Sequence, residues 1–354
     1  MRAKHSQRGF SLVEVMVSIV IALILLAGII QLFISNKQAY RIQEGFSLLS
    51  ENARYSISQL QYHLRIADHW GGVQPDVVDT SIAPAITNDC SAGYSTDNIG
   101  LEGYEGGAGV PADLTACIPA ADYVANSDII VLRYGGTPMS PIYTTCPTAN
   151  DECLENGEVY LRVSTGRQAQ IFQGNNTGGL NSVLDDPDPD SLEPYNIHNY
   201  PYKFVAYFVR PCSSQAAGTA GVCDAADDDT PTLVRLALDG TSLVQEDVAE
   251  GVEQLQIDYG VDTNGNLNAD QYMSVAEIEA TNNWPSVVTV RFNMLVRATN
   301  RDITRSTDDD DNEYYMFGKP YNIDNGPYQV PDADRTFPRK MFTAIVQIRN
   351  QSRS

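Results

Sequence analysis

The first 35 residues decide the fold: MRAKHSQRGFSLVEVMVSIVIALILLAGIIQLFIS (residues 1–35). A short basic leader ends at Gly9, and an apolar run extends from Leu12 to Ile34 with one carboxylate inside it, that of Glu14. As a helix, about 25 such residues would be ~37 Å long, enough to cross a hydrocarbon core of ~30 Å. A lone carboxylate is costly in a membrane-length helix, so Glu14 is a candidate functional residue.

The order of these features differs from that of a secretory signal peptide, which places its small-residue cleavage site after the apolar stretch. The alternative is a plain signal anchor in which Glu14 occurs by chance. The segment Arg8-Gly9-Phe10-Ser11-Leu12-Val13-Glu14 resembles the processing site of type IV pilins and pseudopilins. This resemblance implies insertion in the inner membrane, cleavage between Gly9 and Phe10 by the prepilin peptidase, and methylation of the new amino group on Phe10. In a filament, Glu14 would meet the Phe10 ammonium of a neighbouring subunit.

The apolar pattern continues past the membrane-length run in a different form. From Ile42 to Ala67, apolar residues recur at intervals of three and four with polar side chains between them, which is the pattern of an amphipathic helix. The sequence therefore predicts one helix from about Phe10 to Asp68, ended by the Trp-Gly-Gly stretch at 70–72. Its second half needs a domain to pack against. The predicted parts are a leader (1–9), a membrane and filament-core half (10–34), an amphipathic half (35–70), an irregular disulfide-containing insertion (71–128) and a β-rich head (129–354).

The part of the chain after residue 70 predicts β-structure. Residues 71–128 are rich in Pro, Gly, Asp, Thr and Ser, which indicates loops with short strands. Helical spacing returns only at 275–279. Strands are expected at residues 127–134, 158–164, 203–210, 232–238, 252–259, 286–297 and 341–349. We predict an α+β fold, in which the long N-terminal α-helix packs on a large, mainly antiparallel β-sheet head with extended loops.

Two segments of the head resemble PilW-type minor pilins: GVEQLQIDYGVD (residues 251–262) and RKMFTAIVQIRN (residues 339–350). A strand pair at 207–210 and 233–236, joined by a loop of disulfide size, is also similar to that family. The resemblance implies a type IV pilin-like fold and a non-enzymatic minor pilin that takes part in pilus assembly, in a priming or tip complex. The implied partners are the prepilin peptidase, other minor pilins and the major pilin. The head would lie in the periplasm and then on the pilus at the cell surface.

Two other functions stay open at this point. A pseudopilin of a type II secretion system has the same N-terminal features. A filament-displayed adhesin or binding module would use residues 71–128 or tyrosines expected in loops, among them Tyr200, Tyr202 and Tyr315. A large head is a poor repeating unit for a slim filament, so its size favours a subunit of low copy number.

The charge of the chain excludes some partners. It contains 23 Lys and Arg against 45 Asp and Glu, a net charge of −22. Removal of the leader, with its three basic side chains, would make the net charge about −25. Binding to nucleic acid needs a basic surface, so no nucleic acid is expected as a partner. The acidity favours solubility of an exterior domain, and a specific cationic partner is the alternative.

The six cysteines all follow the apolar helix, and none forms a C-x-x-C motif. An even number outside the membrane fits disulfides made in an oxidising compartment such as the periplasm. Pairing of nearest neighbours gives Cys90–Cys117, Cys146–Cys153 and Cys212–Cys223, although six cysteines allow other connectivities. The last two pairs are favoured because their loops are short.

One segment carries a candidate calcium site. Side-chain oxygens occur at alternate positions in Asp262, Asn264, Asn266, Asn268 and Asp270, which suits calcium and is similar to the start of an EF-hand loop. Leu267 and Met273 occupy the places of the tight-turn glycine and the bidentate glutamate, and a polar hairpin turn explains the segment equally well. The aspartate runs at 185–190, 227–229 and 308–311 are more typical of solvated loops than of metal ligands.

Catalytic motifs are missing from the sequence, which contains no H-E-x-x-H, no G-x-S-x-G and no P-loop. Of the four histidines, His5 belongs to the leader, His63 and His69 lie near the end of the predicted helix, and His198 lies in a segment expected to be a loop. We therefore do not expect an enzyme. An anchored periplasmic enzyme is the alternative, and it would show turnover without the helix.

Overall fold

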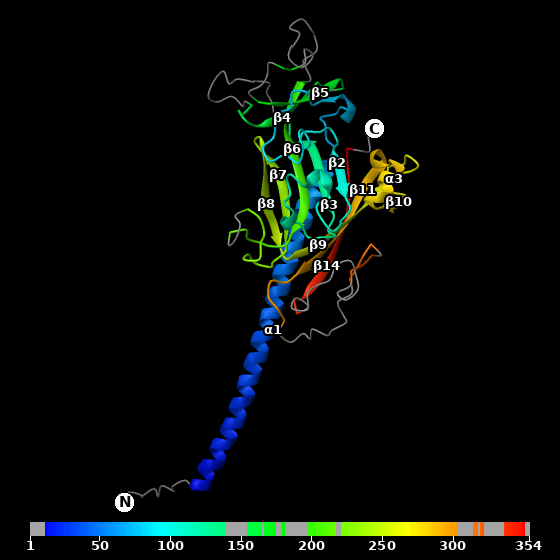
Figure 1. Ribbon diagram of the computed structural model, residues 1–354. Helices are drawn as coiled ribbons and strands as arrows, with labels where there is room; N and C mark the ends of the chain where they lie inside the picture. The colour runs from blue at the N-terminus through cyan, green and yellow to red at the C-terminus, as the bar shows by residue number, and fades with distance from the viewer. Residues whose placement is uncertain are drawn as a thin grey trace, which may run out of the picture. The chain divides into compact units, whose positions relative to one another are not determined.

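The computed structural model describes residues 11–138, 154–164, 166–174, 179–180, 197–216, 221–302, 314–317, 319–321 and 336–350 (Figure 1). The chain divides into two compact units, Met1–Leu48 and Leu49–Ser354. Helix α1 (Leu12–Ile66) contributes its first part to the former unit and its second part to the latter. The α+β architecture predicted from the sequence, a long apolar N-terminal helix followed by a mainly antiparallel head, is confirmed.

The end of α1 differs from the prediction, because the helix stops at Ile66, before the stretch at 70–72. Asp68 has a left-handed backbone conformation (φ 61°), which breaks the helical path. Its N–H donates to the carbonyl of Arg133 in strand β3 (Ile129–Gly135) at 3.1 Å, whereas the N–H of Ala67 still donates within the helix. The neighbouring strand thus takes over the hydrogen bonding at the point where α1 ends.

The larger sheet has eight strands among the described residues, organised by the long strand β6 (Ile197–Arg210). The others are β3 and β1 (Val78–Asp79), β2 (Leu101–Tyr104), β4 (Val159–Ser164), β5 (Gln168–Gln173), β7 (Thr232–Asp239) and β8 (Ser242–Glu250). The paired path is β1-β5-β4-β6-β3-β2, and β7 and β8 continue from β6. The first residues of β6 pair with β4, and the rest pair with β3 and β7, all antiparallel. The β1–β5 pair is parallel.

The smaller sheet has four antiparallel strands in the order β10-β9-β11-β14. These are β9 (Val252–Val261), β10 (Gln271–Met273), β11 (Val287–Arg297) and β14 (Arg339–Gln347). The short helix α3 (Val275–Thr281) begins with a capping box, in which Ser274 and Glu277 each accept the backbone N–H of the other. Shorter elements are the β12 (Tyr314–Met316) and β13 (Lys319–Tyr321) pair and the 3-10 turns η1 (Pro75–Val77), η2 (Ala112–Leu114), η3 (Ala120–Asp122) and η4 (Trp284–Ser286).

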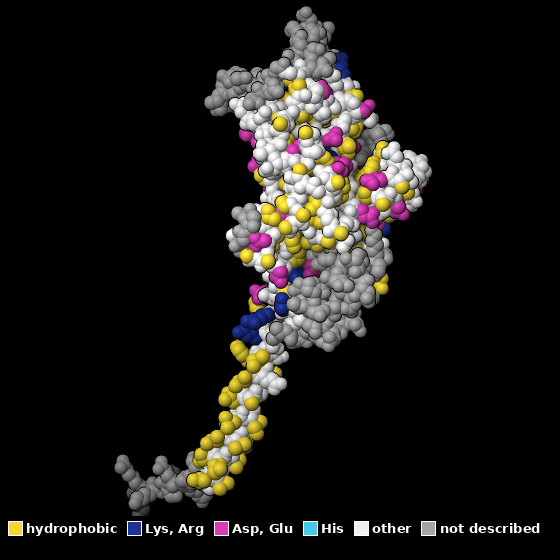
Figure 2. Space-filling model, in the orientation of Figure 1, with side chains coloured by type: hydrophobic (Ala, Val, Ile, Leu, Met, Phe, Trp, Pro, Cys, Tyr) yellow, Lys and Arg dark blue, Asp and Glu magenta, His cyan; other side chains and the backbone are white. Residues whose placement is uncertain are grey.

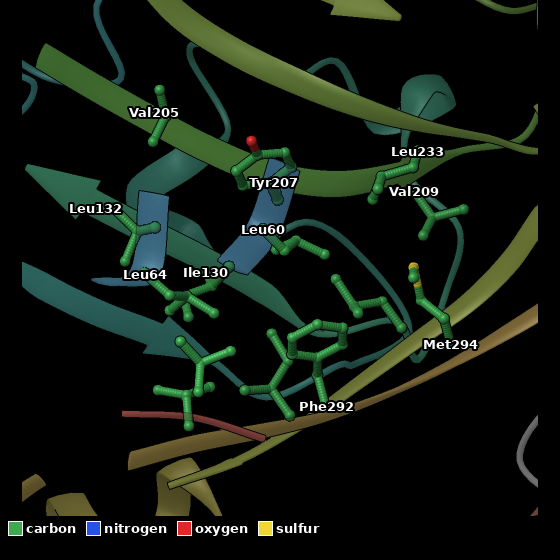
Figure 3. Packing of buried hydrophobic residues seen from close by; sticks show 14 of the residues in the cluster. Leu60, Leu64, Ile130, Leu132, Val205, Tyr207, Val209, Leu233, Phe292 and Met294 are labelled. Carbon is green, nitrogen blue, oxygen red and sulfur yellow. The ribbon is translucent and has the colours of Figure 1, made fainter. Parts of the chain in front are cut away.

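The second half of α1 packs between the two sheets and forms the main core with them. Leu60 and Leu64 are buried with Leu132 of β3, Tyr207 of β6 and Phe292 of β11, and Figure 3 shows these side chains pointing toward one another. The spacing of three and four along the helix places its buried apolar residues on one face: Leu49, Ala53, Leu60 and Leu64, with Ala67 directly after the helix end. The amphipathic pattern in the sequence therefore indicated the face that packs.

The larger sheet is buried on both faces, as strand β6 shows. Val205, Tyr207 and Val209 belong to the core with α1, whereas Phe204 and Phe208 belong to a second core. Alternate side chains of a strand point to opposite faces, so the sheet needs a cover on each side. The stretch from Trp70 to residue 128 supplies the second cover, with side chains such as Leu114 and Ile118. The sequence indicated the short irregular elements of this segment but not its place in the core.

A buried arginine attaches this covering segment to the sheet. Arg133 of β3 is fully buried, and its Nη1 donates to Glu102 Oε2 and to the Ile99 carbonyl, each at 2.8 Å. Its Nε and Nη2 donate to the carbonyl of Tyr94, whose ring centre lies 4.6 Å from the guanidinium carbon. A buried charge is stable only when it is paired and hydrogen-bonded. Arg133 therefore determines where the chain around Tyr94–Glu102 lies.

The seven strands expected from the sequence are all present, with shifted ends; the largest shift is at β6, which begins at Ile197 and not at residue 203. Strands β1 and β2 are short strands of the kind expected, without bounds, in residues 71–128, whereas β5, β8, β10, β12 and β13 were not predicted. Strand β8 shows the reason, because the polar residues Gln245, Glu246 and Asp247 interrupt its β-type pattern. Pairing with β7, and not local preference, makes this segment a strand.

Candidate assembly site and head surfaces

Glu14 lies in the first turn of α1, where a carboxylate interacts favourably with the positive end of the helix dipole. In the isolated chain every residue from Ser11 to Lys37 is exposed, and Figure 2 shows hydrophobic side chains along this part of the helix. Among the described residues, no basic side chain pairs with Glu14. By length and composition the helix can cross a membrane. Gly9 and Phe10 lie outside the described residues, so their processing stays a prediction.

A buried polar network attaches the second half of α1 to the larger sheet. The Nδ1 of His63 lies 2.6 Å from the Tyr134 hydroxyl, and Arg235 Nη1 donates to His63 Nε2 at 3.1 Å. Because Nε2 accepts, the ring proton is on Nδ1 and is donated to Tyr134. Burial, assisted by the charges of Arg235 and Lys203, lowers the pKa of His63 to about 4. The imidazole is therefore neutral at pH 7 and positions the helix.

A buried ion cluster holds together the two segments that resemble PilW-type pilins. Glu253 of β9 accepts from Arg339 Nε at 2.6 Å and from Arg339 Nη2 at 2.8 Å, and Arg297 Nη1 lies 3.7 Å away. All three residues are buried. Loss of one partner from such a pair costs about 3–5 kcal/mol because a charge is left alone. The cluster fixes β9, β11 and β14 at one end of the smaller sheet.

Two of the predicted disulfides are present, Cys90–Cys117 and Cys212–Cys223. Cys146 and Cys153 lie outside the described residues. The fully buried carboxylate of Asp122, in η3, links the two disulfide regions: its Oδ1 accepts from the Cys223 N–H at 2.8 Å, and its Oδ2 accepts from Gln215 Nε2 at 3.0 Å. The disulfides and this carboxylate together hold the covering segment against the loop between β6 and β7.

The five candidate calcium ligands lie together in the loop between β9 and β10, which is closed by its own hydrogen bonds. Asp262 Oδ1 accepts from the N–H groups of Asn264 (3.0 Å) and Gly265 (2.8 Å), and its Oδ2 accepts from that of Leu267 (2.6 Å). Asp270 Oδ1 accepts from Asn264 Nδ2 at 2.7 Å. Leu267 has a left-handed backbone (φ 64°) at the position where an EF-hand has glycine. The arrangement is that of a polar hairpin loop.

These hydrogen bonds also affect the pKa of Asp262. Desolvation alone would raise the pKa of Asp262, but the backbone donors, led by Leu267, lower it below its usual value. Within the described ranges, no group of three or more His, Cys, Asp or Glu side chains could hold a metal ion. The other two candidate ligands, Asn266 and Asn268, are hydrogen-bonded to each other: the backbone N–H and the Nδ2 of Asn268 donate to the side-chain and backbone oxygens of Asn266. Calcium binding stays a prediction.

Several residues expected in loops lie in strand β6. His198 was predicted to be in a loop, and so were Tyr200 and Tyr202, but β6 begins at Ile197. Tyr202 is 2 % exposed and its hydroxyl donates to the Ser95 carbonyl at 2.9 Å, so it packs under the covering segment. The prediction that Tyr200 and Tyr202 lie in loops is therefore wrong. Tyr315, also expected in a loop, lies in strand β12 and is 58 % exposed.

A cleft of about 910 Å³ lies at the C-terminal end of α1, and sequence analysis missed it. Its lining includes Asp68, Trp70, Tyr200 and Trp284, which come from the end of α1, β6 and η4. Trp70 Nε1 donates to Asp68 Oδ1 at 2.7 Å. Burial raises the pKa of Asp68 to about 6, against the opposing effect of this hydrogen bond. The sequence signal for this cleft was that Asp68 and Trp70 stand at the end of a predicted helix. No local sequence pattern predicts that Trp284 lies beside them.

Comparison with family models gives two matches. Residues 206–350 match the model described as Type IV Pilus-assembly protein W, PilW, and residues 4–30 match the prokaryotic N-terminal methylation motif. The two matches indicate a PilW-like minor pilin of the type IV pilus. No curated protein and no solved structure matches it significantly.

The matched ranges fall on distinct parts of this PilW-like pilin. The methylation motif covers residues 4–30, which include part of the predicted leader and the first turns of α1 with Glu14. The PilW match runs from β6 to the end of β14 and contains both segments that carried the resemblance, together with the Glu253–Arg339 pair. The protein takes part in pilus assembly, and its motif implies interaction with the prepilin peptidase and other pilus components. Residues 71–128 lie outside both matches.

Proposed function

We propose that this minor pilin works at low copy number in the priming or tip complex of the type IV pilus. The observation that carries the proposal is the pair of family matches, the methylation motif at 4–30 and PilW at 206–350. The size of the head supports low copy number, because a slim filament cannot accommodate such a domain in every subunit. Its partners in this role are other minor pilins and the major pilin.

The proposed path to the filament begins at the leader. The prepilin peptidase cleaves between Gly9 and Phe10, and the new amino group of Phe10 is methylated. Glu14 then pairs with the Phe10 ammonium of a neighbouring subunit in the apolar filament core. Opposite charges at ~4 Å attract far more strongly in such a core than in water, and each charge would be costly alone. The exposed apolar surface around Glu14 supports this role, because it needs lipid or other helices as a cover.

The head is proposed to lie in the periplasm before assembly and at the cell surface afterwards, as a structural subunit without turnover. The disulfides support an oxidising compartment. The histidines support a structural role as well: His63 holds α1 to the larger sheet, and His69 Nδ1 is bonded to the carbonyl of Gly135 at 2.9 Å.

The test is deletion of the gene, followed by measurement of sheared surface pili and of secreted enzymes in the same cultures. The expected result is a loss of pili with secretion intact, restored by the wild-type gene and not by Gly9→Val. Loss of secretion with pili intact would contradict the proposal and assign the protein to a type II secretion system. If neither changed, assembly would not be its main task, and binding by the head would be tested instead.

Copy number is tested separately, by quantifying the protein against the major pilin in purified pili. The proposal predicts far fewer than one copy per major pilin, with immunogold label at filament ends. Label along the whole filament would contradict it.

A further inference from the structure

The cleft at the C-terminal end of α1 combines features that suit a positively charged group. Two carboxylates, those of Asp68 and Asp76, line it, and the described lining contains no lysine or arginine. Asn350, which also lines the cleft, donates to the carbonyls of Ile66 and Ala67 at 3.3 and 3.0 Å, near the negative end of the α1 dipole. His69 is the one lining side chain that can carry a positive charge, and its Nδ1 is engaged by the Gly135 carbonyl.

Asp68 is oriented for such a contact. Its Oδ1 accepts the indole N–H of Trp70 at 2.7 Å, which fixes the carboxylate plane. Its Oδ2 has no hydrogen-bond partner among the described residues. The approach of Asp68 to residues 98–101 depends on Gly100, where a Cβ would lie 2.1 Å from Asp68 Oδ1. The result is a half-buried carboxylate with one oxygen available, in surroundings that strengthen its attraction to a cation.

Aromatic and apolar side chains complete the wall. Trp284 and Tyr200 line the cleft, and aromatic faces attract ammonium and guanidinium groups as well as their aliphatic stems. Ile99, at the rim, is 46 % exposed. The cleft volume, about 910 Å³, is far larger than one lysine or arginine side chain and leaves room for flanking residues. These features fit a chain segment in which a basic residue stands between apolar ones.

We propose that this cleft binds a lysine or arginine side chain, flanked by apolar residues, on a segment of a partner protein. The strongly acidic chain would attract such a segment over a distance, and the cleft would select it. Most of the lining lies outside the range that matches PilW, so the site belongs to this head and not to the matched region alone. The inference does not depend on a priming or tip position, and its test uses binding alone.

The chain provides its own reporter, because both of its tryptophans, Trp70 and Trp284, line the cleft. The experiment uses the full chain in a non-ionic detergent and follows tryptophan emission during titration with the blocked peptide acetyl-Leu-Lys-Leu-amide. Matched probes are the same peptide with norleucine in place of lysine, the same peptide with glutamate, and n-butylammonium. The matched variants are Asp68→Asn and Asp113→Asn; Asp113 is an exposed aspartate of η2 outside the cleft.

The expected result is a saturable change in emission with the lysine peptide at low salt. Norleucine or glutamate in the peptide should weaken binding at least fivefold, as should Asp68→Asn, whereas Asp113→Asn should change it less than twofold. Asparagine can still accept the Trp70 indole N–H and tolerates a left-handed backbone, so Asp68→Asn should fold. The norleucine peptide tests the same charge contact on the unaltered protein.

Three results would overturn the proposal. Absence of saturation with the lysine peptide would show that the cleft does not bind such a segment. Equal binding of the lysine and norleucine peptides would show that the cleft recognises apolar shape and not charge. Binding of n-butylammonium as tightly as the lysine peptide would make the cleft a site for small organic cations and not for a protein segment.

Discussion

The two halves of α1 have the same backbone conformation but opposite surroundings. In the first half, Ile24 and Leu25 are 67 % and 62 % exposed in the isolated chain. In the second half, Leu60 and Leu64 are 1 % and 0 % exposed, between two sheets of the same chain. The first half is apolar on every side, whereas the second is apolar on one face.

This difference shows that apolar residues on one helix can serve two separate purposes. Those of the second half stabilise the head, because their cover is intramolecular. Those of the first half gain a cover only from a membrane or from other subunits, so their burial belongs to assembly. Changes in the two halves should therefore separate folding of the head from assembly of the filament.

The largest expected effect on stability comes from a leucine in the packed half. Leu64→Ala leaves a cavity among Ile130, Leu132 and Phe292 and should lower the free energy of unfolding of the head by about 2–5 kcal/mol. Leu25→Ala removes the same atoms from the exposed half and should change it by less than about 0.5 kcal/mol. Urea titration of both variants in detergent, followed by tryptophan emission, measures the difference. Equal destabilisation by Leu64→Ala and Leu25→Ala would contradict the difference between the two halves of α1.

Removal of a disulfide should have the next largest effect and should be confined to the head. In the Cys90→Ala, Cys117→Ala double variant the cross-link of a 27-residue separation is lost, and the head should be destabilised by about 2–4 kcal/mol. Membrane insertion of α1 should not change. Urea titration and carbonate extraction of membranes measure the two properties, and release of the variant from membranes would show that the halves are coupled.

A smaller effect on the stability of the head is expected at Asp68, directly after the packed half of α1. Its pKa is raised from 3.8 to about 6, so the folded protein holds the proton more tightly than the unfolded chain. Through this group, stability is gained as the pH falls below 6 toward 3.8 and is lost as the pH rises through 6. Asp68→Asn should therefore melt roughly 2–4 °C above the wild type at pH 7, and the difference should vanish below about pH 4.

Melting curves of the two proteins between pH 4 and pH 8 test this dependence. His69 and Asp76, which line the same cleft, are unchanged in the variant, so the difference between the proteins reports Asp68 alone. A constant difference at all pH values would mean that Asp68 does not titrate in this range.

The smallest and most local effect is expected in the loop between β9 and β10. Asp262→Ala removes the acceptor of several backbone N–H groups, so the amides of Asn264 to Leu267 should exchange faster with solvent. Hydrogen exchange in the presence of EDTA measures this, with Asp239→Ala, at the exposed last residue of β7, as a control. Loss of protection in the wild type on addition of EDTA would favour the calcium prediction over the hydrogen-bonded hairpin.

The sequence predicted the parts of the molecule whose signals are local. The apolar run around Glu14, the spacing of three and four from Ile42 to Ala67 and the runs of β-type residues that form β9, β11 and β14 are all visible in the local sequence. The segment 71–128 has no hydrophobic periodicity. Its position is set by Arg133 and by Asp122, whose hydrogen-bond partners are distant in sequence. The cleft could not be predicted for the same reason, since Trp284 joins Asp68 only through the tertiary fold.

The central claim is that the first half of α1 serves assembly through Glu14 and not the stability of the head. The most direct measurement is complementation of a deletion strain with Glu14→Gln, with quantification of the protein in membranes and in sheared pili. The account predicts a variant that is processed, present in membranes at the wild-type level and melts as the wild type does, but is depleted at least tenfold from pili. Wild-type incorporation of Glu14→Gln into pili, or a destabilised head, would contradict it.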